Sequence, residues 1–109
     1  MSNSSFPNAQ NQPAGAMPVY ETGYAAKNIT TSTSTLVKTG VGTFGRVTVN
    51  TAQAGATVTV YDGIDNTGVK LATIGAAAQV SLAFGIALAT GLYVVTVGGT
   101  PADVTVAYL

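Results

Sequence analysis

Apolar and polar residues alternate with a period of two along much of the chain after residue 35. In the run FGRVTVN, Val47 and Val49 alternate with polar neighbours, and in ATVTVYD Val58 and Val60 do the same. This alternation predicts β-strands that bury one face. Similar strand-length runs follow: VKLATI, AQVSLAFGI, LYVVTV and VTVAYL. Valine and threonine dominate them, as is typical of half-buried pleated sheets.

Turn signals separate these strand segments, among them GVG, GIDNTG, ATG and GGTPAD. None of the strand segments has apolar residues at helical spacing. About seven short strands separated by regularly spaced turns are typical of an antiparallel sandwich. We therefore predict an all-β domain over residues 35–109: a small antiparallel β-sandwich, either a jelly roll or immunoglobulin-like.

Residues 1–34 have a different composition, rich in serine, threonine, asparagine and proline and without either periodicity. They predict an extended polar N-terminal arm. Large apolar side chains are nevertheless spaced through this arm: Phe6, Met17, Val19, Tyr20 and Tyr24. Anchors of this kind suit an arm that docks on a neighbouring subunit and orders on binding. A tail that packs on its own domain would have the same composition, so both interpretations stay open.

The segment Val80–Val97 is apolar enough to suggest a membrane span. Glycines divide it at strand-length intervals, and its apolar residues recur with a period of two rather than 3.6. Basic and aromatic anchors do not flank both of its ends. We therefore predict strands here and no membrane partner.

Charged residues make up only 7% of the chain and cancel to a net charge of zero, whereas about a quarter is usual. A basic patch for nucleic acid is thereby excluded, and a surface without charge tends to associate. A small domain without cysteine has no disulfides to support its core. Self-association is the expected alternative, through the uncharged half of the chain that begins at Leu71.

The run TGVGTFGRVTV places Gly40, Gly42 and Gly45 in a G-x-G-x-x-G pattern that resembles a phosphate-binding loop. A strand pattern follows Gly45, so the helix N-terminus that a dinucleotide needs is missing. The other motifs of a kinase are also missing, and the chain has no histidine. The pattern therefore predicts a glycine-rich β-turn.

Asp62 and Asp65 form the one close acidic pair, in YDGIDNTG. Their spacing does not suit a calcium loop, and no glutamate follows them. They also lack the aromatic and polar surroundings of a sugar-cleaving dyad. Asp-Gly and Asn-Thr-Gly are instead typical of hairpin turns. We expect no enzyme, and neither a metal site, a cofactor nor a small-molecule substrate.

Residues 29–109 carry several short motifs: Val37–Gly40, the V-T-V-N run of Val47–Asn50, the turn from Val58 to Asp62, the strand Lys70–Ile74 and the closing sequence GGTPAD. With these motifs the region resembles a small β-domain that recurs in structural proteins of tailed bacteriophages. The motifs mark the fold and not a catalytic site.

The resemblance implies a virion protein, and one small domain with one arm favours a head decoration (cement) protein. Cement proteins similar to this chain are commonly homotrimers that lie across joints between subunits of the major capsid protein, on the outer surface of the phage head. A tail or tail-fibre adaptor is the alternative, and a membrane-active small phage protein is a weaker one.

Overall fold

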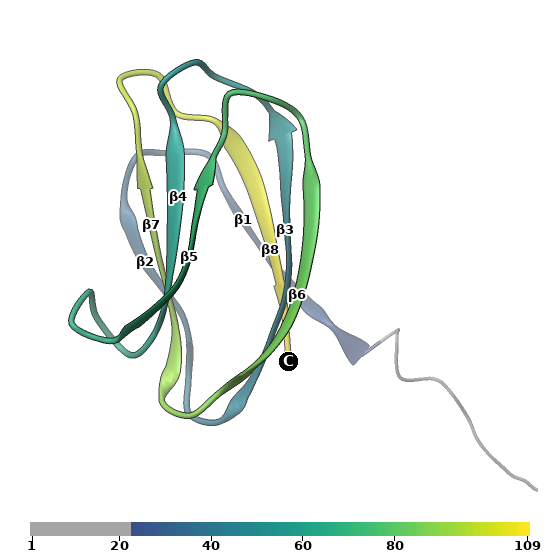
Figure 1. The fold of residues 1–109 in the computed structure, drawn as a ribbon, viewed down its shortest axis with the longest axis vertical. Coiled ribbons are helices and arrows are strands. Elements are labelled where there is room, and N and C mark those ends of the chain that lie inside the picture. Colours follow the sequence, from purple (N-terminus) through teal and green to yellow (C-terminus); the bar gives the residue numbers. More distant parts are fainter. Residues whose placement is uncertain (1–22) are drawn as a thin grey trace, which may run out of the picture.

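Eight β-strands make up the part of the chain that the computed structural model describes, residues 23–109 (Figure 1). Their bounds are β1 Ala25–Ile29, β2 Ser34–Thr39, β3 Gly42–Thr51, β4 Thr57–Asp62, β5 Val69–Gly75, β6 Ser81–Leu88, β7 Gly91–Val97 and β8 Asp103–Tyr108. They form two four-stranded sheets of order β1-β8-β3-β6 and β2-β7-β4-β5, in which all neighbours are antiparallel. The predicted antiparallel sandwich is confirmed.

The strand order is that of a jelly roll. Each strand of the first half pairs with its counterpart from the second half, in the pairs β1–β8, β2–β7, β3–β6 and β4–β5. A long hairpin wrapped into two sheets gives this nesting, which defines the eight-stranded jelly roll. Of the two alternatives that the sequence left open, the jelly roll is therefore the one that the chain adopts.

One strand more than predicted is present: β1, the first along the chain, lies inside the range 1–34 that the sequence analysis assigned to the arm. It pairs with β8 along its whole length, from Ala25 opposite Tyr108 to Ile29 opposite Val104. The sandwich thus includes residues 25–34 and has eight strands rather than about seven. Of the five β1 side chains only Ile29 is buried, which is why no alternation marked this strand in the sequence.

The alternating valines point into the sandwich as predicted. Val47, Val49, Val58 and Val60 are buried, while their polar neighbours face outward or are only partly covered. Phe44 is the largest fully buried side chain and stacks on Phe84 with 4.7 Å between ring centroids. The last two strands contribute four more buried side chains to the core: Leu92, Val94, Val104 and Val106.

The apolar segment Val80–Val97 forms most of the β6–β7 hairpin, Ser81–Leu88 and Gly91–Val97. The period of two therefore predicted its structure correctly. Among residues 23–109, no helix has the length and apolarity that crossing a membrane requires.

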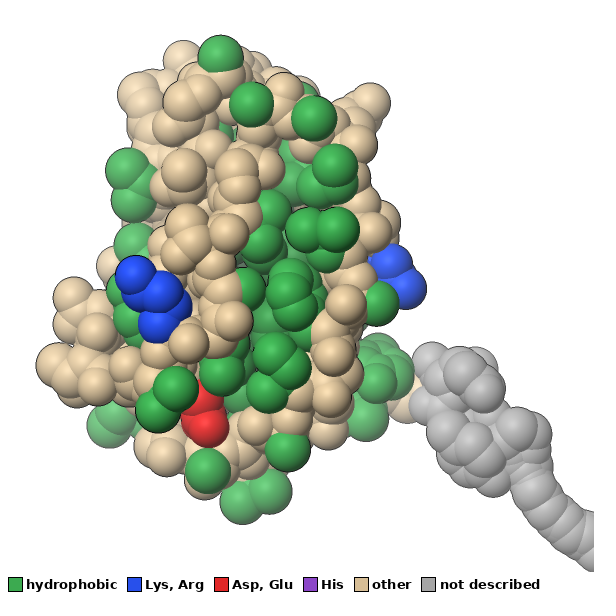
Figure 2. All heavy atoms as spheres, viewed as in Figure 1, with side chains coloured by type: hydrophobic (Ala, Val, Ile, Leu, Met, Phe, Trp, Pro, Cys, Tyr) green, Lys and Arg blue, Asp and Glu red, His purple; other side chains and the backbone are tan. Residues whose placement is uncertain are grey.

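One side of the sandwich is incompletely closed, between the edge strands β5 and β6. These strands end different sheets and do not pair with each other. Figure 2 shows apolar side chains along the line between them. We call this surface the open side. It consists of Leu71 and Ala72 of β5 and Leu82, Phe84 and Ile86 of β6.

Candidate partner-binding surfaces

Both aspartates of YDGIDNTG stabilise turns, but only Asp65 does so within the loop that the sequence predicted. The Asp62 carboxylate, at the end of β4, accepts hydrogen bonds from the backbone amides of Ala89 (3.0 Å) and Thr90 (2.9 Å) in the β6–β7 turn. Asp65 accepts a bond of 2.9 Å from the Thr67 amide within its own loop. The two carboxylates thus serve different turns. Within the described part of the chain, three or more potential metal ligands do not gather at any point.

The hydrogen bonds to Asp62 make the stability of the fold depend on pH. They lower the pKa of the carboxyl below its ordinary value of 3.8, the Ala89 amide contributing most and the Thr90 amide next, while desolvation opposes them. This stabilisation is complete above the ordinary pKa and is lost as the pH falls through the lowered folded pKa.

We therefore expect the free energy of unfolding to decrease as the pH falls below about 4. The variant Asp62→Asn should be less stable than the wild type at pH 7 and should show a smaller decrease toward acid. Denaturant unfolding over a pH series measures both effects. The pKa of Asp65 is also lowered, first by the Thr67 hydroxyl, so part of the slope should remain in Asp62→Asn. Identical slopes in the two proteins would contradict the role of Asp62.

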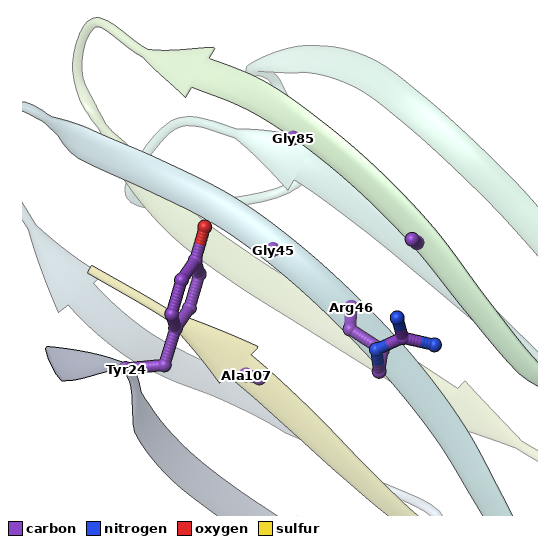
Figure 3. Close-up of a pocket in the computed structure, with 6 residues that line it drawn as sticks. Tyr24, Gly45, Arg46, Gly85 and Ala107 are labelled. Carbon is purple, nitrogen blue, oxygen red and sulfur yellow. The ribbon is translucent and has the colours of Figure 1, made fainter. Parts of the chain in front are cut away.

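The outer face of the β1-β8-β3-β6 sheet carries a hollow of about 490 Å³ beside Tyr24 (Figure 3). Its lining consists of Tyr24, Gly45, Arg46, Ala83, Gly85 and Ala107. The Tyr24 ring lies over Gly45 so closely that a β-carbon at position 45 would collide with it. Glycine and alanine thus form a flat floor, with an aromatic ring on one side and the Arg46 guanidinium on the other. Arg46 donates a hydrogen bond of 2.8 Å to the Ser81 hydroxyl.

Tyr24 is the one predicted arm anchor that the structure describes. It contacts its own domain through Gly45, and 43% of its surface stays exposed. Its contact with the domain and its exposed surface suit both interpretations of the arm. The other four predicted anchors, Phe6, Met17, Val19 and Tyr20, lie outside the described residues.

The same sheet face carries a polar network next to the hollow, which the sequence analysis did not anticipate. The Asn28 amide donates to the Asp103 carboxylate at 2.7 Å, and the Asn50 amide donates to the Thr105 hydroxyl at 2.9 Å. Asn50 also reaches Asp103 at 3.2 Å. These groups satisfy one another across β1, β8 and β3, so this half of the face is already supplied with hydrogen-bond partners.

The outer face of the other sheet presents an apolar and aromatic surface, which we call the tyrosine face. It consists of Leu36 of β2, Tyr61 of β4, and Tyr93, Val95 and Val97 of β7. Tyr93 lies between Leu36 on one side and Tyr61 on the other in the strand register. The two tyrosine rings are 6.3 Å apart and tilted by 54°. Lys70, paired with Tyr61, brings one positive charge to its border.

Tyrosine is enriched at protein interfaces because its ring provides a large apolar contact and its hydroxyl a hydrogen bond. The tyrosine face combines two such rings with exposed Leu36 and Val97. The alternation in the sequence predicted that Tyr61 lies on the outer face of its strand, away from the buried valines. It could not show that Tyr93 and Leu36 lie beside Tyr61, since that depends on the strand order.

Comparison with protein-family models, with curated proteins and with solved structures found no match for this chain.

Proposed function

We propose that this chain is a non-enzymatic virion protein of a tailed phage: a decoration (cement) protein that binds the outer surface of the assembled head and bridges subunits of the major capsid protein. The resemblance of residues 29–109 supports the phage virion. The tyrosine face is the observation that supports the partner-binding role, because aromatic side chains gathered with exposed apolar ones are typical of protein interfaces.

The low charge of the chain supports the same role. Charged residues are 7% of the sequence, and the tyrosine face combines the exposed side chains of Leu36 and Val97 with its two tyrosine rings in one patch. Such exposure is typical of surfaces that meet a partner. Jelly rolls also occur in viral capsid domains and in lectins, an analogy of fold that does not by itself assign a function.

The mechanism of a cement protein is differential binding. A protein that binds the assembled shell and not its free subunits shifts the equilibrium toward the shell by the difference in its binding free energies. The proposed homotrimer would place three copies of the tyrosine face in one particle-binding unit. Modest contacts of each copy then combine into strong overall binding.

Replacing a tyrosine of this face tests the proposal. In Tyr93→Ser the central ring of the face is lost, and we expect binding to purified heads to weaken by roughly 30-fold, as for an interface hot spot of about 2 kcal/mol. Co-sedimentation of the labelled protein with particles lacking it measures the affinity.

Val41→Ser is the matched control, since Val41 is 78% exposed in the β2–β3 turn and lies outside the tyrosine face. It should bind like the wild type. Wild-type affinity of Tyr93→Ser, with circular dichroism showing that both variants are folded, would contradict the proposed role of the tyrosine face.

The arm is tested by deletion, and the structure fixes where the deletion must end. Because β1 begins at Ala25 and covers β8, removing residues 1–30 would damage the sandwich itself. Deletion of residues 1–22 should leave the sandwich folded and its self-association intact, and should abolish binding to the head. Unchanged binding of the truncated protein would remove the arm from the proposal.

A further inference from the structure

The open side between β5 and β6 exposes side chains that point toward the core. Along β6, Leu82, Phe84 and Ile86 lie on the same side of the strand as the buried Leu88. None of the three is buried, and Leu82 remains 41% exposed. Their counterparts on the facing edge strand β5 are Leu71 and the small Ala72, so a part of the core is left uncovered.

The backbone at the open side is also unpartnered. Among residues 23–109, β6 pairs only with β3 and β5 pairs only with β4, so no described strand pairs with the other edge of either. The β6 sequence SLAFGIAL has no charge and no proline. Edge strands usually carry charged residues or proline, because these prevent pairing with other chains. β6 has a bulge beside Gly85, where the register with β3 shifts, but with neither charge nor proline its apolar edge remains suited to pairing with another chain.

We propose that a second copy of this chain covers the open side. The charge distribution favours this occupant, because the sequence from Leu71 to Ala102 contains no charged residue. Two copies that meet through this half of the chain would bring no like charges together. A partner selected by charge would find no complementary group there.

The self-contact gives the proposed decoration protein a second binding surface. The biological role of this contact rests on the proposed function. The open side and the tyrosine face belong to different parts of the sandwich: the former lies between the two sheets, and the latter on the outer face of one of them. Self-association through the open side therefore leaves Tyr61 and Tyr93 free to bind the head.

The test introduces a charge into the open side. Because Leu82 is partly exposed, a lysine there can extend its ammonium group into water in the monomer, whereas in the assembly it would be buried without a counter-charge. We expect Leu82→Lys to weaken self-association at least tenfold. Sedimentation equilibrium of the full chain over a concentration series measures it.

Ala87→Lys is the matched control. Ala87 is exposed on the same strand but pairs opposite Thr43 and belongs to the opposite face of β6 from Leu82. It should self-associate like the wild type. A monomeric wild type at the highest concentration, or an unchanged oligomer of Leu82→Lys, would overturn the inference.

Hydrogen exchange of the wild type provides a reading that does not depend on a variant's folding. The β6 amides that do not pair with β3 should exchange more slowly at concentrations where the protein is assembled than after dilution. Equal exchange at all concentrations would overturn the inference. So would a monomer in which these amides become faster only when residues 1–22 are deleted, because the occupant would then be the chain's own N-terminal segment.

Binding to heads is measured on the same variants, so that the inference and the proposed function can fail separately. An oligomer that depends on Leu82 but does not bind heads would refute the proposed function and leave the inference standing. Undiminished head binding by a protein that is monomeric throughout would do the opposite.

Discussion

Phe44→Ala is expected to lower the free energy of unfolding by about 3–5 kcal/mol, the usual effect of removing a buried phenylalanine. Phe44 is fully buried in the core and stacks on Phe84 with 4.7 Å between ring centroids. Removing its ring leaves a cavity. The hydrogen-bonded backbones of the two packed sheets cannot move far enough to fill it. For a domain of this size the loss is a large fraction of the total stability.

Urea unfolding at pH 7, followed by circular dichroism, measures this loss. Val41→Ala is the matched control, because Val41 also belongs to the β2–β3 region but is 78% exposed. It should change the free energy of unfolding by no more than about 0.5 kcal/mol. A loss below about 1 kcal/mol in Phe44→Ala would contradict the full burial of this ring in the core.

Gly91→Ala is expected to lower the free energy of unfolding by about 3 kcal/mol, at the upper end of the usual cost of overpacking. Gly91 begins β7 and is buried. A β-carbon there would lie 2.7 Å from the Lys38 carbonyl oxygen and 2.8 Å from the Gly63 carbonyl oxygen. Both neighbours are backbone atoms at the ends of β2 and β4, so neither can move without disturbing the strand pairing.

Gly75→Ala provides the comparison, since it is the same substitution at the end of β5. A β-carbon at Gly75 would meet nothing within 4 Å. The reduced freedom of the unfolded chain should make this variant equally or slightly more stable, by up to about 1 kcal/mol. Thermal and urea unfolding of the two variants side by side measure the contrast. Equal stabilities would show that the space around Gly91 is less restricted than its contacts indicate.

The sequence predicted the fold class and most strands because burial on one face leaves a direct trace. Val47, Val49, Val58 and Val60 alternate with polar residues and are all buried. The glycine pattern of GVG was correctly interpreted as a turn: Gly40 links β2 to β3 with a φ of 87°, a left-handed conformation that favours glycine.

Other features left no such trace. β1 buries only Ile29, and its position is fixed by pairing with β8, about 75 residues further along the chain. The jelly-roll order likewise depends on long-range pairing. For the same reason the tyrosine face could not be assembled from the sequence: Leu36, Tyr61 and Tyr93 come from three strands that only the strand order brings together.

Asp62 and Asp65 show which contacts the local sequence can predict and which it cannot. The residues of YDGIDNTG indicated a turn, and Asp65 does stabilise its own loop through Thr67. Asp62, by contrast, binds amides of the β6–β7 turn, a contact across 27 residues of sequence at Ala89. Local turn chemistry predicts the first role, while the second follows only from the meeting of two hairpins in the folded domain.

The copy number of this protein relative to the major capsid protein in purified phage particles tests the central claim most directly. Quantitative mass spectrometry of the particles measures the ratio. A ratio near one to one, or a fixed large fraction of it, is the result that a head decoration protein requires. A handful of copies per particle would contradict head decoration and favour the tail adaptor, and absence from the particles would contradict a virion protein of either kind.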